Sequence, residues 1–192
     1  MRHFRGFLGG MILFLGLFSI GYAEDHNLQY FLSKTSSKTG ELSKMERTEL
    51  LDRMDGLIEQ AQQIHKKLAE NVQTGEIDFR YQEGRFWMSK LEEDQGSIET
   101  AIQQLKLLRE KPTHLVASIC LYKSLKDLSA NFSAYNNVPS FSAWVGDLAP
   151  EMELWVDPIF YKLYLLPLAR SKDVEKEPPQ REIKPIPKGK KP

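Results

Sequence analysis

The sequence predicts an all-α protein, an antiparallel four-helix-type bundle with a proline-broken last helix. Three observations predict this fold. Apolar residues recur at intervals of three and four over long stretches, which is the helical period. No alternating run of β-branched residues bounded by turn residues competes with that pattern. The helical stretches are joined by short connections, and short connections favour antiparallel neighbours.

Composition divides the 192 residues into four segments. Residues 1–23 combine a basic start, an uncharged apolar run and small residues before the cut, which predicts a signal peptide cleaved near Ala23. An uncleaved membrane anchor is the alternative, because the 18-residue uncharged run is at the short edge for spanning a bilayer. Residues 24–42, rich in Ser, Thr and Lys, predict a flexible linker. The helical bundle domain is expected over 43–169, followed by a disordered Lys/Pro-rich tail over 170–192.

The first helix of the bundle is expected over residues 44–74. Ser43 and Glu46 stand three residues apart before an apolar run, which is the spacing of a capping box. Gly75 follows the last apolar position and predicts the end of the helix.

The second helix is expected to begin between residues 76 and 85 and to end before Pro112, because the residue before a proline avoids the helical conformation. A third helix is expected to be capped by Thr113 and to end at the turn residues 136–139. Its apolar residues form two stripes, so we expect it to be the most central helix. The stripes are Leu121, Leu125, Leu128, Phe132 and Tyr135, and Leu115, Ile119 and Tyr122.

The fourth region is interrupted by prolines. Short helices are expected over 140–148, 150–156 and 158–166, with Asp157 and Pro158 as a start signal for the last. Helical spacing persists across the breaks, so one kinked helix is the alternative.

Charge is unevenly distributed along the chain. Residues 24–169 carry a net charge of −6, and residues 170–192 a net charge of +4. Nucleic-acid-binding domains are usually basic, so an acidic body predicts no nucleic-acid partner. Cys120 is the only cysteine, which excludes an intramolecular disulfide and a thiolate-rich metal site. Its apolar setting predicts a buried, inert thiol.

Signatures of catalysis or metal binding are missing from the sequence. His65 and His114 lie on different expected helices, without the spacing of metal ligands, and are expected to face solvent. Glu92, Glu93 and Asp94 form an acidic cluster that predicts a solvated helix face. Neither a nucleophile elbow nor a Gly-rich phosphate loop occurs. We therefore assign no catalytic residue, cofactor or metal, and the sequence favours a protein that is not an enzyme.

An aromatic segment precedes the tail. Trp155, Phe160, Tyr161 and Tyr164 crowd together within ten positions. They fit either the core and a cap over the end of the bundle, or an exposed patch that meets a partner or a membrane interface. These four residues are candidates for partner contact.

The tail carries a second set of candidates. Lys184, Lys188, Lys190 and Lys191 follow one another with no acid after Glu182, so anionic lipid or acidic polymer would attract them. A purely solubilising tail is the alternative.

These features predict an exported cell-envelope protein, periplasmic or secreted, that binds a protein partner through its helical surface and basic tail. The term periplasm assumes a Gram-negative source. A small-ligand carrier or an enzyme, with a pocket between helices near Trp155 and Tyr164, is the alternative. A haem or metal bundle is a third hypothesis.

Overall fold

The computed structural model describes residues 27–37, 41–74 and 81–174. These residues fold into helices and connecting turns with no strand among them, which confirms the all-α prediction. The expected signal peptide and the four tail lysines lie outside the described residues. Within the described ranges, no helix combines the length and the apolar character needed to cross a bilayer.

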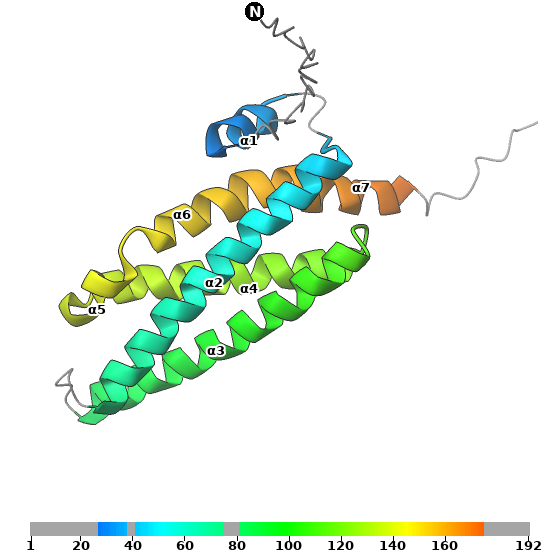
Figure 1. The fold of residues 1–192 in the computed structure, drawn as a ribbon. Coiled ribbons are helices and arrows are strands. Elements are labelled where there is room, and N and C mark those ends of the chain that lie inside the picture. Colours follow the sequence, from blue (N-terminus) through cyan, green and yellow to red (C-terminus); the bar gives the residue numbers. More distant parts are fainter. Residues whose placement is uncertain (1–26, 38–40, 75–80, 175–192) are drawn as a thin grey trace, which may run out of the picture.

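Three long helices follow one another along the chain. They are α2 (Lys44–Thr74), α3 (Tyr81–Glu110) and α4 (Leu115–Asn136), and successive helices run in opposite directions (Figure 1). α3 packs against both α2 and α4. The predicted capping box begins α2, since the Ser43 amide donates to Glu46 Oε2 at 2.6 Å and the Glu46 amide donates to Ser43 Oγ at 3.2 Å.

α4 differs from prediction at its start. Its cap is His114 and not Thr113, because His114 Nδ1 accepts a hydrogen bond from the Ala117 amide at 3.1 Å. An unprotonated ring nitrogen serves there as the acceptor that a hydroxyl usually provides. α4 packs against α3, α5, α6 and η1, yet its second apolar stripe is not buried, since Ile119 is 48% exposed.

The helical structure of the fourth region is interrupted once and is continuous after that interruption. α5 (Pro139–Val145) ends at Gly146, whose φ of 55° turns the chain. From there α6 (Leu148–Leu154), the π-helix η1 (Trp155–Leu165) and α7 (Leu166–Val174) follow without a gap.

The predicted start at Asp157 and Pro158 is therefore wrong, because both residues lie inside η1. A proline ring clashes with the carbonyl four residues earlier in an α-helix. The hydrogen bonds of a π-helix span five residues, so this segment accommodates Pro158 without a break. The continuous kinked helix described above as the alternative is closer to the observed structure.

α1 (Leu28–Thr35) lies in the segment that was expected to be a flexible linker. Asn27 caps it by accepting from the Tyr30 amide at 3.0 Å. Phe31 is fully buried, with its ring centroid 5.7 Å from that of Trp155. The helix has only eight residues and one buried side chain, Phe31, so it is too short to show a helical period in the sequence. The domain also continues beyond residue 169, because α7 reaches Val174.

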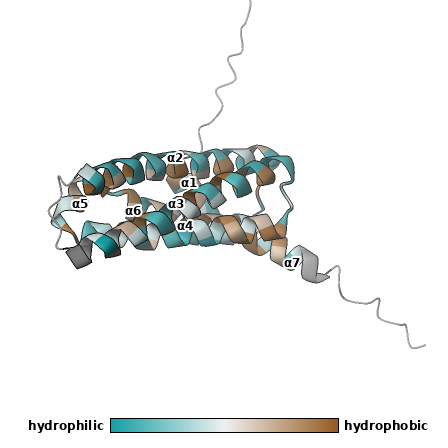
Figure 2. Cartoon of the chain, turned by 90° about the horizontal axis from the view of Figure 1, so that it is seen from below, coloured by the Kyte–Doolittle hydropathy of each residue, from teal (hydrophilic) through white to brown (hydrophobic). Residues whose placement is uncertain are grey.

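The core runs along the whole length of the helices. Figure 2 shows apolar and polar residues alternating along α2, as expected of a helix with one buried face. The fully buried side chains include Leu50, Met54, Ile98, Leu105, Leu125 and Phe132.

Candidate functional site

A carboxyl group is buried between α3 and α4. Asp94 is 0% exposed and accepts hydrogen bonds from Tyr135 Oη at 2.5 Å and Asn131 Nδ2 at 2.7 Å. The expectation of a solvated acidic face holds for Glu92 and Glu93, which are exposed, and is wrong for Asp94. The sequence contains a signal for this site, because the polar side chains of Asp94, Asn131 and Tyr135 stand at positions that continue the apolar stripes of their helices.

Burial dominates the electrostatics of this group. It raises the pKa of Asp94, although the hydrogen bonds from Tyr135 and Asn131 act in the opposite direction. Burial and the neighbouring carboxyl raise the pKa of Tyr135. His65 is buried too, contrary to the expectation that it faces solvent, and its Nε2 lies 2.8 Å from the Leu91 carbonyl oxygen. The carboxyl group of Asp94 can therefore retain a proton, and its hydrogen bonds with Tyr135 and Asn131 join α3 to α4.

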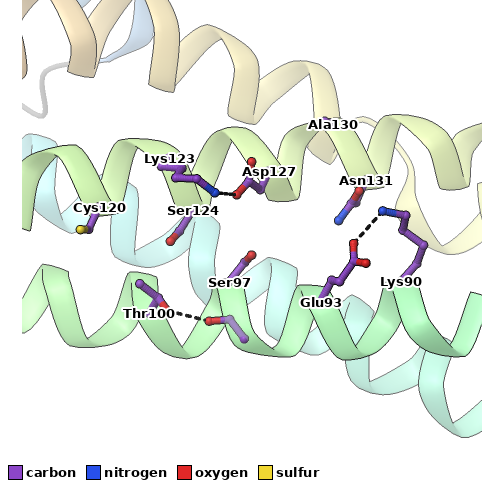
Figure 3. A pocket seen from close by; sticks show the side chains of 11 residues that line it. Lys90, Glu93, Ser97, Thr100, Cys120, Lys123, Ser124, Asp127, Ala130 and Asn131 are labelled. Carbon is purple, nitrogen blue, oxygen red and sulfur yellow. Dashed lines mark hydrogen bonds and ion pairs between the residues drawn. The ribbon is translucent and has the colours of Figure 1, made fainter.

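A polar groove of about 670 Å³ runs over the same pair of helices (Figure 3). Ser97 of α3 and Ser124 of α4 point toward one another across it. Asn131 lines the groove and connects it to the buried Asp94. Cys120 also lines it and is half-buried, so its thiol is less enclosed than expected.

The charged side chains of the groove are paired with each other. Lys90 Nζ lies 2.6 Å from Glu93 Oε2, and Lys123 Nζ lies 2.6 Å from Asp127 Oδ2. These pairs give the groove no excess of either sign, so it offers polar contacts without a strong preference for a charged ligand.

A second polar cluster joins α4 to η1. Tyr122 Oη donates to Asp157 Oδ1 at 2.6 Å, while Lys126 Nζ contacts Asp157 Oδ2 at 2.9 Å and Glu153 Oε1 at 2.6 Å. The hydrogen bond from Tyr122, followed by that from Lys126, lowers the pKa of Asp157. The same bond raises the pKa of Tyr122 to about 12. The cluster therefore holds the Tyr122 ring in place at the surface.

An apolar surface, the α4–η1 patch, adjoins this cluster and consists of Val116, Ile119, Tyr122 and Tyr161. Val116, Ile119 and Tyr161 are 63%, 48% and 40% exposed. The three α4 members follow at intervals of three residues and so lie along one side of that helix. Tyr122 joins them to η1, because its ring centroid lies 5.5 Å from that of Tyr161.

The structure separates the four aromatic candidates. Trp155, Phe160 and Tyr164 are buried, at 5%, 0% and 3% exposure, so in the folded chain they belong to the core and not to an exposed patch. Phe160 and Tyr164 stack with centroids 5.0 Å apart. Tyr161 is the member of the four that faces solvent. The sequence analysis assigned Ile119 to an apolar stripe of a central helix and did not single out Val116.

A smaller cavity, the end pocket, has a volume of about 250 Å³ and lies at one end of the helices. It is found beside Tyr164, where a pocket was expected, although Trp155 does not line it. Its lining comes from the residues just before α2, the first turn of α2, the α3–α4 connection, η1 and α7. The lining residues are Glu41, Leu42, Arg47, Pro112, Thr113, Leu163, Tyr164, Pro167, Leu168 and Ser171.

In the described ranges, no three His, Cys, Asp or Glu side chains lie close enough together to hold a metal ion. No protein-family model, curated protein or solved structure matches this chain.

Proposed function

We propose that this protein is an exported, non-enzymatic component of the cell envelope that binds a protein partner, with a four-helix bundle as the rigid support of its binding surface. The observation that carries the proposal is the α4–η1 patch. Apolar side chains exposed together across two elements are typical of interaction sites, and aromatic residues are enriched in such sites. Tyr122 is held by Asp157, so part of the surface is ordered before a partner arrives.

Export and the role of the tail are parts of the same proposal. Residues 1–23 direct the chain out of the cytoplasm, with cleavage near Ala23. Lys184, Lys188, Lys190 and Lys191 then attract the protein to an anionic lipid or polymer surface. Each lysine contributes about 1 kcal/mol near such a surface, and less as salt rises.

Site-specific photo-crosslinking in intact cells tests the patch. A photoreactive amino acid at Val116 is expected to yield a crosslinked band that the same group at Glu59, an exposed position on α2, does not yield. The double variant Ile119→Lys and Tyr161→Ser is expected to remove the band while leaving the circular dichroism spectrum unchanged. Identical bands at both positions, or none at Val116, would refute binding through the patch.

A separate experiment tests the tail. Because α7 extends to Val174, the truncation should end there and not within the helix. We expect the full chain to float with anionic vesicles, and both the truncated chain and a variant with the four lysines changed to glutamine to stay unbound. Equal flotation of all three proteins would contradict a role of the tail at membranes.

A small-ligand carrier is the second candidate function. The end pocket beside Tyr164 favours it, because a cavity bordered by elements far apart in the sequence is a common place for a ligand.

A further inference from the structure

We propose that the end pocket binds a small carboxylate with an apolar body, through Arg47. This inference rests on the carrier alternative and is independent of partner binding by the α4–η1 patch, so either proposal can fail alone.

Arg47 is the group that selects the ligand. Its guanidinium lies 5.9 Å from the centroid of the Tyr164 ring, and its Nη2 donates to the Leu42 carbonyl oxygen at a long 3.4 Å. Within the described part of the chain, Arg47 has no carboxylate partner. A guanidinium has five N–H donors in a planar fork that matches the two oxygens of a carboxylate. Most of these donors are therefore available for an anionic ligand.

The walls of the pocket suit an apolar body. Leu42, Leu163, Pro167 and Leu168 present aliphatic surface, and the Tyr164 ring adds an aromatic face. The Tyr164 hydroxyl is already used, since it donates to the Pro112 carbonyl oxygen at 2.9 Å. Burial raises the pKa of Tyr164 to about 12, so the phenol stays neutral at physiological pH and does not repel an anion.

The volume of the pocket and the charge of its lining restrict the class of ligand further. At about 30 Å³ for each water-sized group, the pocket of about 250 Å³ holds roughly eight non-hydrogen atoms, so a somewhat larger ligand would leave the end of its body outside the pocket. Glu41 also lines the pocket and opposes a second negative charge there. One carboxylate with a short aliphatic body fits these constraints better than a phosphate or a dicarboxylate. Such a carboxylate is either a free short-chain acid or the end of a peptide.

Titration of the isotopically labelled full chain, followed by NMR, tests the site. The probes are octanoate, N-acetyl-leucine, 1-octanol and acetate. We expect saturable shifts at residues of the end pocket with octanoate or N-acetyl-leucine. Octanol lacks the charge and acetate lacks the apolar body, so neither compound should produce saturable shifts. Tighter binding of octanoate assigns a free acid, and tighter binding of N-acetyl-leucine assigns a peptide terminus.

Variants of single residues test whether the carboxylate binds in the end pocket. Arg47→Gln is expected to weaken it by tenfold or more, and Glu41→Gln to strengthen it about twofold, because it removes a like charge. Thr113→Trp fills the pocket from an exposed position, so it should abolish binding without opening the core. Lys106→Gln removes an exposed charge from α3 and is the matched control, expected to bind as the original chain does.

Unchanged affinity in Arg47→Gln and Thr113→Trp, or no saturable shift with either carboxylate, would overturn the proposal. The patch variant Ile119→Lys should retain octanoate binding, which separates this result from the fate of partner binding.

Discussion

Among single residues, Asp94 is expected to make the stability of the fold depend on pH. Burial raises its pKa, so the folded chain binds this proton more tightly than the unfolded chain does. Its contribution is fully present below the ordinary value of 3.8 and is lost as pH rises through the folded pKa. Asp94→Asn is uncharged at every pH. We therefore expect the unfolding free energy of the variant minus that of the original chain to increase between about pH 4 and about pH 7.

Chemical denaturation at several pH values measures this difference. Glu93→Gln is the control, because it makes the same change of charge one residue earlier at an exposed position. A pH-independent difference for Asp94→Asn would show that Asp94 has the same pKa in the folded and unfolded chains.

Gly146 is a residue whose conformation requires glycine. Its φ of 55° is unfavourable for a residue with a Cβ, although a Cβ there would meet no atom within 4 Å. Gly146→Ala should therefore lower the unfolding free energy by about 1–3 kcal/mol through backbone strain alone. Gly56→Ala is the matched control, since it lies inside α2 with equal space around it and should stabilise the chain by up to about 1 kcal/mol. Equal melting temperatures of the two variants would disprove the strain.

The type of the residue explains why the burial of Asp94 was not predicted from the sequence. Asp94 stands three residues after Leu91 and four before Ile98, both buried, so its position in the core follows from spacing. Its acidic side chain led to the opposite prediction, because a buried carboxyl requires donors from another helix. Asn131 and Tyr135 supply them from α4, and no local pattern pairs residues 37 and 41 positions apart.

Among the helices, α1 is attached by the burial of Phe31 and by hydrogen bonds to one charged residue, Glu46. Glu46 accepts hydrogen bonds from Lys34 and Tyr30 of α1 while it completes the capping box of α2. Burial alone would raise its pKa, but the bonds from Lys34, Tyr30 and Ser43 outweigh burial and lower it to about 2. The contribution of Glu46 to the attachment of α1 is thus fully present above the ordinary pKa of 4.5 and is lost as pH falls toward 2.

Glu46→Gln tests this attachment. We expect it to cost roughly 1.5–3 kcal/mol, because charge-assisted hydrogen bonds are lost. Amide hydrogen exchange should accelerate in α1 more than in α3. Glu59→Gln, at an exposed position of α2, is the control and should leave exchange in α1 unchanged. Uniform acceleration in all helices would mean that α1 does not open separately.

η1 shows why the proline-containing region was harder to predict than the long helices. The bounds of α2 were predicted because its apolar period, its capping box and Gly75 agree. In η1 the period and the prolines disagree. The buried side chains of Ile159, Phe160 and Leu163 keep the segment helical, and the wider turn then accommodates Pro158. Which of two conflicting signals prevails depends on packing with α1 and α4, and that packing is a property of the assembled fold.

For the whole molecule, carboxyls with raised and with lowered pKa values act in opposite directions. Asp94 favours folding at lower pH, whereas Glu46 and Asp157, whose pKa values are lowered, favour folding at higher pH. We therefore expect stability to be highest in mildly acidic solution. Thermal unfolding between about pH 3 and pH 8 measures it, and in Asp94→Asn the maximum should broaden toward neutral pH. A maximum above pH 8 in the original chain would contradict this account.

The place of the end pocket in the fold leads us to expect a particular response to force applied across it. Residues 41 and 42, just before α2, and residues 167, 168 and 171 of α7 border the same cavity. A pull on these two points would separate them directly and break contacts one after another, as in a zipper. Sequential rupture requires less force than shearing whole helices past one another. Tension between these two segments would therefore open the end pocket before the long helices separate, and a carboxylate bound there as proposed would be released.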